Sequence, residues 1–173
     1  MSSRAAGRGK RVSLDLRPLV ARDLAWFVVL RNEVRDALHD PRSFTHSDAC
    51  AWFGRGRTRY WVIERSGIRV GYFRFACAQT LAGGAWIGAD VAPQFHRQGI
   101  ALAAYPRFME LMESHLRVSS WWLEVLSTNA PALSLYARLG FLEVERHDLA
   151  GRQCSSIVMR APRRGGPPLL VPE

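Results

Sequence analysis

Cysteine is scarce in this chain of 173 residues, and its spacing narrows the possible chemistry. The three cysteines, Cys50, Cys77 and Cys154, lie far apart, with no CxxC pair and no cluster with histidine. Metal sites built on cysteine normally show such clusters, so no metal is expected. We expect three reduced and mostly buried thiols.

Lysine is almost absent: Lys10 is the only one, although lysine and arginine together number 24 and the net charge is +9. A charge of this sign suits an anionic partner such as CoA, a nucleotide-linked sugar or a nucleic acid. The one-sided use of arginine is equally typical of coding bias, and part of the charge lies at the two ends of the chain. Nucleic acid therefore remains an open alternative as a partner.

Long hydrophobic runs are also missing. No apolar stretch approaches the roughly 20 residues that span a bilayer, and no apolar segment of a secretory signal follows the basic N-terminus. We therefore expect a cytoplasmic protein without membrane contact. Residues 1–11, rich in Gly, Ser and Arg, and residues 162–173, rich in Pro and Gly, are predicted to be tails around one folded domain, residues 12–161.

Hydrophobic periodicity within this domain predicts strands and helices in alternation. The order is strand, two helices, three strands, helix, strand, helix and two strands, which indicates an α/β (α+β) fold with a mixed, mostly antiparallel sheet and helices on both faces. Ser47 is a candidate N-cap of the second helix. The predicted strands are residues 12–16, 60–65, 68–78, 85–91, 121–126, 142–148 and 154–160, and the predicted helices are 22–35, 46–53, 99–116 and 130–139.

The most informative segment is HRQGIA, residues 96–101, which joins a strand ending near Val91 to the start of a helix. The free N–H groups at a helix start and the positive end of the helix dipole together form an anion site. Gly99 permits close approach of the backbone to a phosphate, and Arg97 could add charge-assisted hydrogen bonds. On its own, the pattern is more often that of an ordinary turn.

A second segment, LEVLSTNAPALSLYARLGF at residues 123–141, changes that balance. Together the two segments resemble the GNAT superfamily of acetyl-CoA-dependent N-acetyltransferases. HRQGIA is similar to its Q/R-x-x-G-x-G/A pyrophosphate loop, with His96 where Gln or Arg is usual. The second segment is similar to the family's N-x-x-A-x-x-L-Y-x-x-x-G-F pattern, and the resemblance covers residues 12–160.

The resemblance implies a single-domain enzyme that binds acetyl-CoA between the strand ending at Val91 and the strand ending at Leu126. It implies that the Tyr136 hydroxyl protonates the departing thiolate and that a backbone N–H near Val91 stabilises the oxyanion. The implied cofactor contacts are Val91, Ala92, His96, Arg97, Gln98, Gly99, Ile100, Ala101, Asn129 and Tyr136.

The general base is left open by the sequence. Asp90 and Glu124 lie on neighbouring predicted strands, close to where these should separate, and either could take a proton from the acceptor amine directly or through water. Each could equally be an outward-facing or salt-bridged carboxylate. His46 and His147 are further candidates for the base, although a lone histidine is usually structural. No Ser-His-Asp or Cys-His set is evident, so we expect direct transfer without a covalent enzyme intermediate.

The resemblance implies that the first two predicted helices and the loops after them determine the acceptor amine. Here these segments include LRNEVR at 30–35 and FTHSDACAWF at 44–53. This pattern resembles members that acetylate nucleotide-linked amino sugars, and similar strings occur in relatives that act on protein N-termini. Arg31, Asn32 and His46 are the polar residues that could face the acceptor. The hypotheses are a small anionic or nucleotide-linked amine, a macromolecular amine on protein or nucleic acid, and a non-catalytic CoA-binding module; a homodimer remains open.

Overall fold

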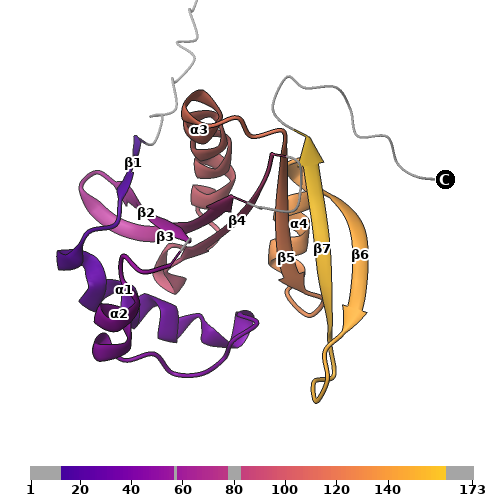
Figure 1. The fold of residues 1–173 in the computed structure, drawn as a ribbon, viewed down its shortest axis with the longest axis horizontal. Helices are drawn as coiled ribbons and strands as arrows, with labels where there is room; N and C mark the ends of the chain where they lie inside the picture. Colours follow the sequence, from indigo (N-terminus) through magenta and orange to yellow (C-terminus); the bar gives the residue numbers. More distant parts are fainter. Residues whose placement is uncertain (1–12, 57, 78–82, 163–173) are drawn as a thin grey trace, which may run out of the picture.

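A single twisted sheet of seven strands organises the protein (Figure 1). The computed structural model describes residues 13–56, 58–77 and 83–162. The strands are β1 (Leu14–Pro18), β2 (Arg59–Arg65), β3 (Ile68–Cys77), β4 (Gly84–Val91), β5 (Ser120–Leu126), β6 (Leu142–Asp148) and β7 (Ser155–Pro162). The helices are α1 (Leu24–Glu33), α2 (His46–Trp52), α3 (Ile100–His115) and α4 (Ala130–Arg138), and the short 3-10 turns are η1 (Ala21–Asp23), η2 (Arg35–Ala37) and η3 (Pro93–Phe95).

The central feature of the sheet is the contact between β4 and β5, which is its one parallel pairing among the described strands. The strand order is β1-β2-β3-β4-β5-β7-β6. β4 and β5 pair only where Gly84–Trp86 lies beside Ser120–Trp122, although both strands continue beyond this stretch. The two strands therefore diverge toward Val91 and Leu126 (Figure 1), as expected from the sequence.

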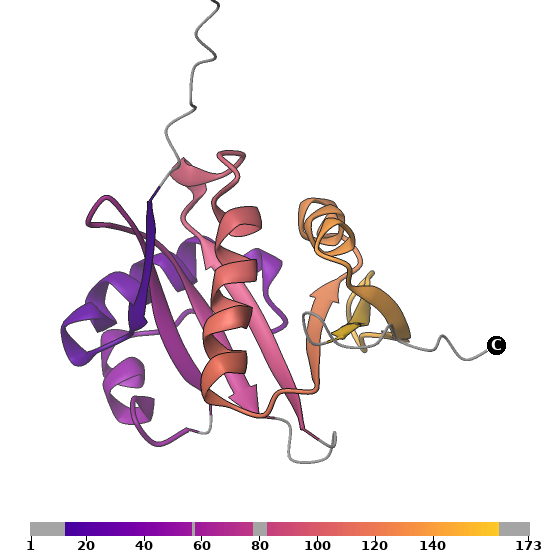
Figure 2. The same ribbon diagram turned by 90° about the horizontal axis from the view of Figure 1, so that it is seen from above.

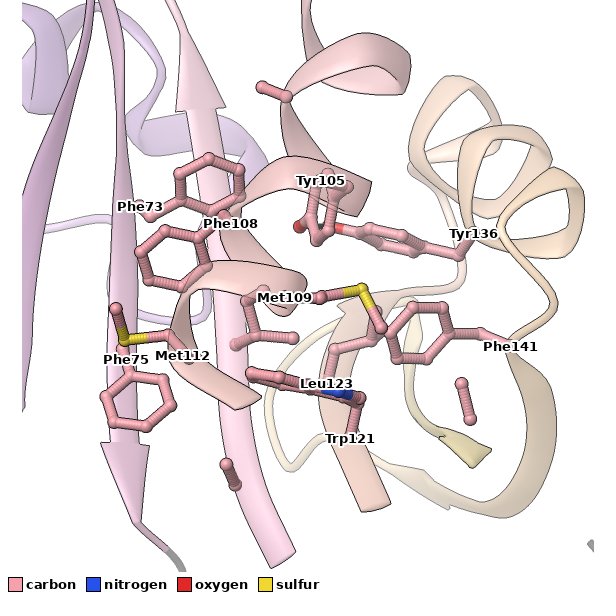
Figure 3. Packing of buried hydrophobic residues seen from close by; sticks show 14 of the residues in the cluster. Phe73, Phe75, Tyr105, Phe108, Met109, Met112, Trp121, Leu123, Tyr136 and Phe141 are labelled. Atoms are coloured by element: carbon pink, nitrogen blue, oxygen red, sulfur yellow. Dashed lines mark hydrogen bonds between the residues drawn. The ribbon is translucent and has the colours of Figure 1, made fainter. Parts of the chain in front are cut away.

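The two faces of the sheet carry separate cores, because side chains alternate across each strand. α3 and α4 cover one face, where Phe73 of β3 stacks on Phe108 of α3 with ring centroids 4.3 Å apart (Figure 3). α1 and α2 cover the opposite face (Figure 2). There Phe27 packs against Tyr72 with ring centroids 4.8 Å apart. Helices thus pack against both faces of the sheet.

Every predicted strand and helix is present, and the structure corrects several details. The first predicted helix is interrupted, since residues 21–37 form η1, α1 and η2 in succession. Thr45, not Ser47, is the N-cap of α2, because its side chain accepts a hydrogen bond from the Asp48 N–H and the Asp48 carboxylate accepts one from the Thr45 N–H. Pro162 belongs to β7, where it pairs with Ser120, so the folded domain extends one residue beyond the predicted boundary.

The cysteines are less buried than predicted. Cys50 and Cys77 are exposed and Cys154 is half-buried, because α2 buries only Ala49 and turns Cys50 toward solvent. In the described part of the chain, no three His, Cys, Asp or Glu side chains are grouped so that they could hold a metal ion. None of the helices within the same residues is both long and apolar enough to cross a membrane.

Candidate active site

A cavity of about 770 Å³ passes from the α1–α2 side of the sheet to the divergence of β4 and β5. Asp90 on β4 and Glu124 on β5 both line it, and Asn129 and Tyr136 on the α4 side line it as well. Aromatic side chains form much of its opposite wall, among them Phe27, Phe44, Trp52, Tyr60 and Tyr72. The divergence of two parallel strands therefore gives one space that contacts both carboxylate candidates, Asn129 and Tyr136. Val91, Ala92 and the loop 96–101 are not among the residues that line it.

The turn after β4 has the geometry expected of an anion-binding helix start. Gly99 is the N-cap of α3 and adopts the left-handed conformation, with φ of 72°. Arg97, two residues earlier, is also left-handed, with φ of 58°, which is costly for a residue that carries a Cβ. The first N–H groups of α3 have no partner within the helix. The space around the Gly99 α-carbon is open, so an anion could approach the backbone there.

Some side chains of the loop 96–101 make contacts within the protein, and others are exposed. Ile100 is 3% exposed and packs in the core, so only its backbone is available to a ligand. The His96 ring lies 2.8 Å from the carbonyl of Val91, and the Gln98 amide accepts from Arg65 at 2.6 Å. These contacts hold the loop against the end of β4, while Arg97 remains exposed.

Tyr136, the predicted general acid, is buried at the wall of the cavity. It is 7% exposed, lines the cavity and points from α4 toward Tyr105 of α3 (Figure 3). The Tyr105 hydroxyl donates to the Tyr136 hydroxyl at 3.3 Å, which leaves the proton of Tyr136 free to be donated elsewhere. Burial raises the pKa of Tyr136, so the phenol stays protonated at neutral pH.

Asn129 has a structural role that the sequence did not indicate. It is the N-cap of α4, and its side-chain oxygen accepts from the Ala132 N–H at 3.2 Å. Pro131 fits the first turn of the helix, and Gly140 ends it with φ of 85°. Asn129 thereby fixes the helix that carries Tyr136, while it also lines the cavity.

Asp90 is held in an ion pair. Its carboxylate accepts from Nη1 of Arg74 at 2.7 Å, and its side chain is only 11% exposed. Arg74 lies opposite Gly88 in the β3–β4 register, and a Cβ at position 88 would meet the guanidinium at 2.8 Å. Glycine at this position therefore makes room for the guanidinium on the cavity floor.

Glu124 lies among neutral groups and histidines instead. Its side chain is 38% exposed, and it accepts a short hydrogen bond from the hydroxyl of Ser156. Nε2 of His147 lies 3.3 Å from the same carboxylate oxygen, and Nε2 of His39 lies 3.7 Å from it. Of the two carboxylates predicted as possible bases, Asp90 is paired with Arg74, and Glu124 has no arginine partner among the described residues.

The three predicted acceptor residues have different placements. Arg31 lines the cavity, but its guanidinium donates to the carbonyls of Asp40 and Arg42 and so holds the loop before α2. Asn32 uses both ends of its amide on the backbone of Phe44, at 2.8 and 2.9 Å. His46 is exposed beside Cys50 and is not among the residues that line the cavity.

Three residues of the site went unnoticed in the sequence: Arg74, His39 and Ser156. Arg74 follows the strand alternation that places it on the Tyr72 face, but nothing in the sequence marks that face as a cavity. His39 and Ser156 are 117 positions apart and lie 2.8 Å from each other. Only the tertiary fold brings such residues together, and no local pattern could have found the pair.

The sheet opens between the parallel strands β4 and β5, and the glycine-capped start of α3 lies after β4. Comparison with known proteins identifies the family. The sequence profile described as acetyltransferase (GNAT) domain matches residues 13–142, and the chain belongs to this family. An N-alpha-acetyltransferase of Sulfurisphaera tokodaii is 35% identical over 78 residues, which make up 44% of this chain and 46% of the relative. The chain thus matches about half of the length of this relative.

Solved structures share the fold at low sequence identity. Spermidine N-acetyltransferase from Vibrio cholerae, in complex with CoA and spermine, superposes with a TM-score of 0.76 at 20% identity over 87% of this chain and 96% of its own. An acetyltransferase from Salmonella typhimurium, solved with acetyl-CoA, gives 0.72 at 17% identity over 86% of this chain and 93% of its own. At identities this low, the superpositions show that the fold is shared and nothing more.

Proposed function

We propose that this protein transfers an acetyl group from acetyl-CoA to a primary amine by direct attack. The observation that carries the proposal is the single cavity that joins Glu124 and Asp90 to Tyr136 through the divergence of β4 and β5. Such a cavity allows an amine and a thioester to meet from opposite sides. Holding two reactants in one orientation is itself a large source of rate enhancement.

The binding of acetyl-CoA is proposed to rest on the loop 96–101 and on the end of β4. The pyrophosphate would lie against the N–H groups that start α3, where Gly99 leaves open space. Beyond Trp86 the edge of β4 has no pairing with β5, so this edge as far as Val91 could bind an extended pantetheine arm. The Ala92 N–H donates to the Val70 carbonyl at 2.8 Å, so Ala92 would contribute no N–H donor. Backbone N–H groups at that edge would also stabilise the oxyanion.

The proton steps are assigned to groups on the two sides of the cavity. Tyr136 would donate a proton to the leaving thiolate, because burial keeps its phenol protonated and its proton is not used by Tyr105. Removal of the amine proton is assigned to the Glu124 side, since Asp90 is paired with Arg74. A cytoplasmic location is part of the proposal and rests on the sequence alone.

For the acceptor, we propose a small amine that carries an anionic group, with a nucleotide-linked amino sugar as the first candidate. The guanidinium of Arg74 lies at the cavity, and its Nη1 is paired with Asp90. Arg31 and Arg42 also line the cavity, but Arg31 donates to backbone carbonyls and Arg42 is paired with Asp40, so Arg74 is the cation that we assign to the anionic group. Arginine binds carboxylate and phosphate well. The cavity also holds Asp40 and Asp48, so a polyamine, as bound by the Vibrio structure, is a direct competitor.

The alternative is a macromolecular amine. The N-alpha-acetyltransferase relative and the net charge of +9 favour a protein N-terminus or an amino-modified nucleic acid, respectively. The test is thiol release from acetyl-CoA with a panel of nucleotide-linked amino sugars, polyamines, N-terminal peptides and aminated nucleic acid. Thiol release with every panel member at no more than the rate of spontaneous hydrolysis would refute the proposed function. Preference for peptides or nucleic acid would select the alternative.

Arg74 provides a test of the acceptor class. Arg74→Gln should reduce kcat/KM for an anionic amine by about tenfold to a hundredfold, while an uncharged amine of similar size should be affected less. If both amines lose the same factor, Arg74 only orients Asp90 and the anionic acceptor is not supported.

A further inference from the structure

A chain of hydrogen bonds leads from His39, in the loop after η2, to Glu124 on β5. Nε2 of His39 lies 2.8 Å from the Ser156 hydroxyl, and that hydroxyl donates to Glu124. Ser156 is fully buried on β7, opposite Leu126 of β5 in the register. A buried hydroxyl must satisfy both its donor and its acceptor functions, and here two different partners do so.

The direction of the chain determines the tautomer of His39. A serine hydroxyl has one hydrogen, and in this chain Glu124 receives it. Toward His39 the same oxygen can therefore only accept, so Nε2 must carry the ring hydrogen. The neutral ring then has its lone pair on Nδ1, which makes Nδ1 the basic atom.

The surroundings of His39 keep the ring neutral. Burial is the main cause that lowers its pKa, and the cationic neighbours Arg74 on β3 and Arg152 in the β6–β7 turn act in the same direction, as does His147 on β6. Glu124 opposes them but does not reverse the shift. His39 is also one of the residues that line the cavity between α1 and Tyr136.

We propose that His39 is a catalytic base of the proposed reaction, with Ser156 and Glu124 as positioning residues that stabilise its imidazolium form. This inference rests on the proposed function. The acceptor ammonium loses one N–H proton to Nδ1 of His39. Its nitrogen lone pair then forms the C–N bond while the C–S bond breaks. The nitrogen loses its second proton to solvent, the thiolate takes a proton from Tyr136, and Tyr136 regains one from solvent. His39 returns its proton to solvent, so one proton is released in each turnover.

The test compares His39→Gln with the wild-type protein over a range of pH. Kcat/KM for the best acceptor should fall by about a hundredfold or more at neutral pH, with unchanged affinity for CoA. Kcat/KM of the wild type should fall at acid pH as His39 becomes protonated. This decrease, the acid limb of the pH profile, should be absent in the variant. His115→Gln, an exposed site at the end of α3, is the matched control and should match the wild type.

The two positioning residues have their own signatures. Glu124→Gln removes the group that raises the pKa of His39, so the acid limb should shift to lower pH while kcat falls. Ser156→Ala removes the acceptor of the Nε2 hydrogen. Nitrogen NMR of the wild-type ring should show the hydrogen on Nε2, and the variant should lose this fixed tautomer.

Three results would overturn the inference. The first is an active wild type with a His39→Gln variant of equal rate and pH profile, which leaves the proposed function in place. The second is a loss of rate in His147→Gln but not in His39→Gln, and the third is a ring hydrogen found on Nδ1. A wild type that acetylates no amine is a different result, because it removes the proposed function and this inference with it.

Discussion

Tyr136 is the residue whose chemistry can be separated most cleanly from its packing. Tyr136→Phe keeps the ring, which makes an edge contact with Tyr105 at 5.8 Å, and removes the proton that we assign to the leaving sulfur. We expect kcat to fall about tenfold to a thousandfold, with a KM for acetyl-CoA within about threefold of wild type, because the hydrogen bond strengthens as charge develops. Steady-state thiol release measures both constants.

The stability of Tyr136→Phe must be measured as a control, because the Tyr136 hydroxyl also makes a hydrogen bond in the core. Its loss leaves the buried Tyr105 hydroxyl without its acceptor, which should reduce the free energy of unfolding by about 1–3 kcal/mol. A melting curve checks this value. An unchanged kcat in a folded Tyr136→Phe protein would remove the general-acid assignment and leave the cofactor site intact.

Asp23 gives a prediction about stability and pH. It is 1% exposed, and Arg17 donates to both of its oxygens at 2.7 and 3.0 Å. The Arg17 hydrogen bonds lower the pKa of Asp23 from 3.8 to about 2. A lowered carboxyl pKa gives stability that is present above the unfolded value and is lost as pH falls through the folded value. We expect on the order of 2 kcal/mol of unfolding free energy to disappear between about pH 5 and pH 2.

Denaturant unfolding at several pH values, with Asp23→Asn beside the wild type, tests this linkage. The variant should be less stable at pH 7 and should lack this part of the acid dependence. Asp15→Asn, at an exposed position of β1, is the matched control. An Asp23→Asn protein with the wild-type pH dependence would show that other carboxyl groups carry the effect.

Individual residues show where the sequence is sufficient and where it is not. Tyr136 and Gly99 were predicted because each lies in a contiguous motif that keeps its local geometry in the fold. Asn32 and His46 are near the predicted acceptor region in sequence, but one amide holds the backbone of Phe44 and the other side chain lies outside the cavity lining. His39 and Arg74 were missed because their role depends on contacts between distant strands and loops.

At the scale of elements, the proposal assigns the pyrophosphate of acetyl-CoA to the start of α3. Gly99→Glu should abolish measurable CoA binding, because the side chain would place bulk and negative charge in the open space beside the first N–H groups of the helix. Gly151→Glu in the β6–β7 turn is a matched control, since Gly151 has a similar φ of 74° and equally open surroundings. Calorimetric titration with CoA measures both.

The two glycine variants should suffer similar backbone strain, of roughly 1 kcal/mol, because both require a left-handed residue with a Cβ. Their stabilities should therefore be alike and their CoA affinities different. CoA affinity retained in a folded Gly99→Glu protein, or lost to the same extent in both variants, would contradict the assignment of the pyrophosphate to this loop.

The element pattern itself could be predicted because each strand and helix has a clear hydrophobic period and clear turn residues. The pairing of β4 with β5 over only three residues, Gly84–Trp86, could not be predicted in the same way. It depends on the packing of α3 and α4 against one face and of α1 against the other. The sequence showed that the two strands end near one another, but the extent of the opening belongs to the tertiary structure.

At the scale of the whole molecule, the account places all of the chemistry within one domain. A shortened chain of residues 12–162 should keep turnover on a small acceptor within about twofold of the full chain, because the cavity is lined by residues within this range. The boundary includes Pro162, which pairs with Ser120 at the end of β7. Turnover lost in a shortened chain with an unchanged melting curve would show that a terminal segment takes part in binding.

The central claim is that one cavity brings amine and thioester together without an enzyme-bound acetyl group. Rapid-quench single turnover with acetyl-labelled acetyl-CoA and excess full-length protein tests it most directly. The account predicts no labelled protein when the amine is omitted, and thiol release in step with formation of the N-acetyl product when the amine is present. Stoichiometric acetylation of the protein before the amine is added, followed by its transfer, would contradict the account.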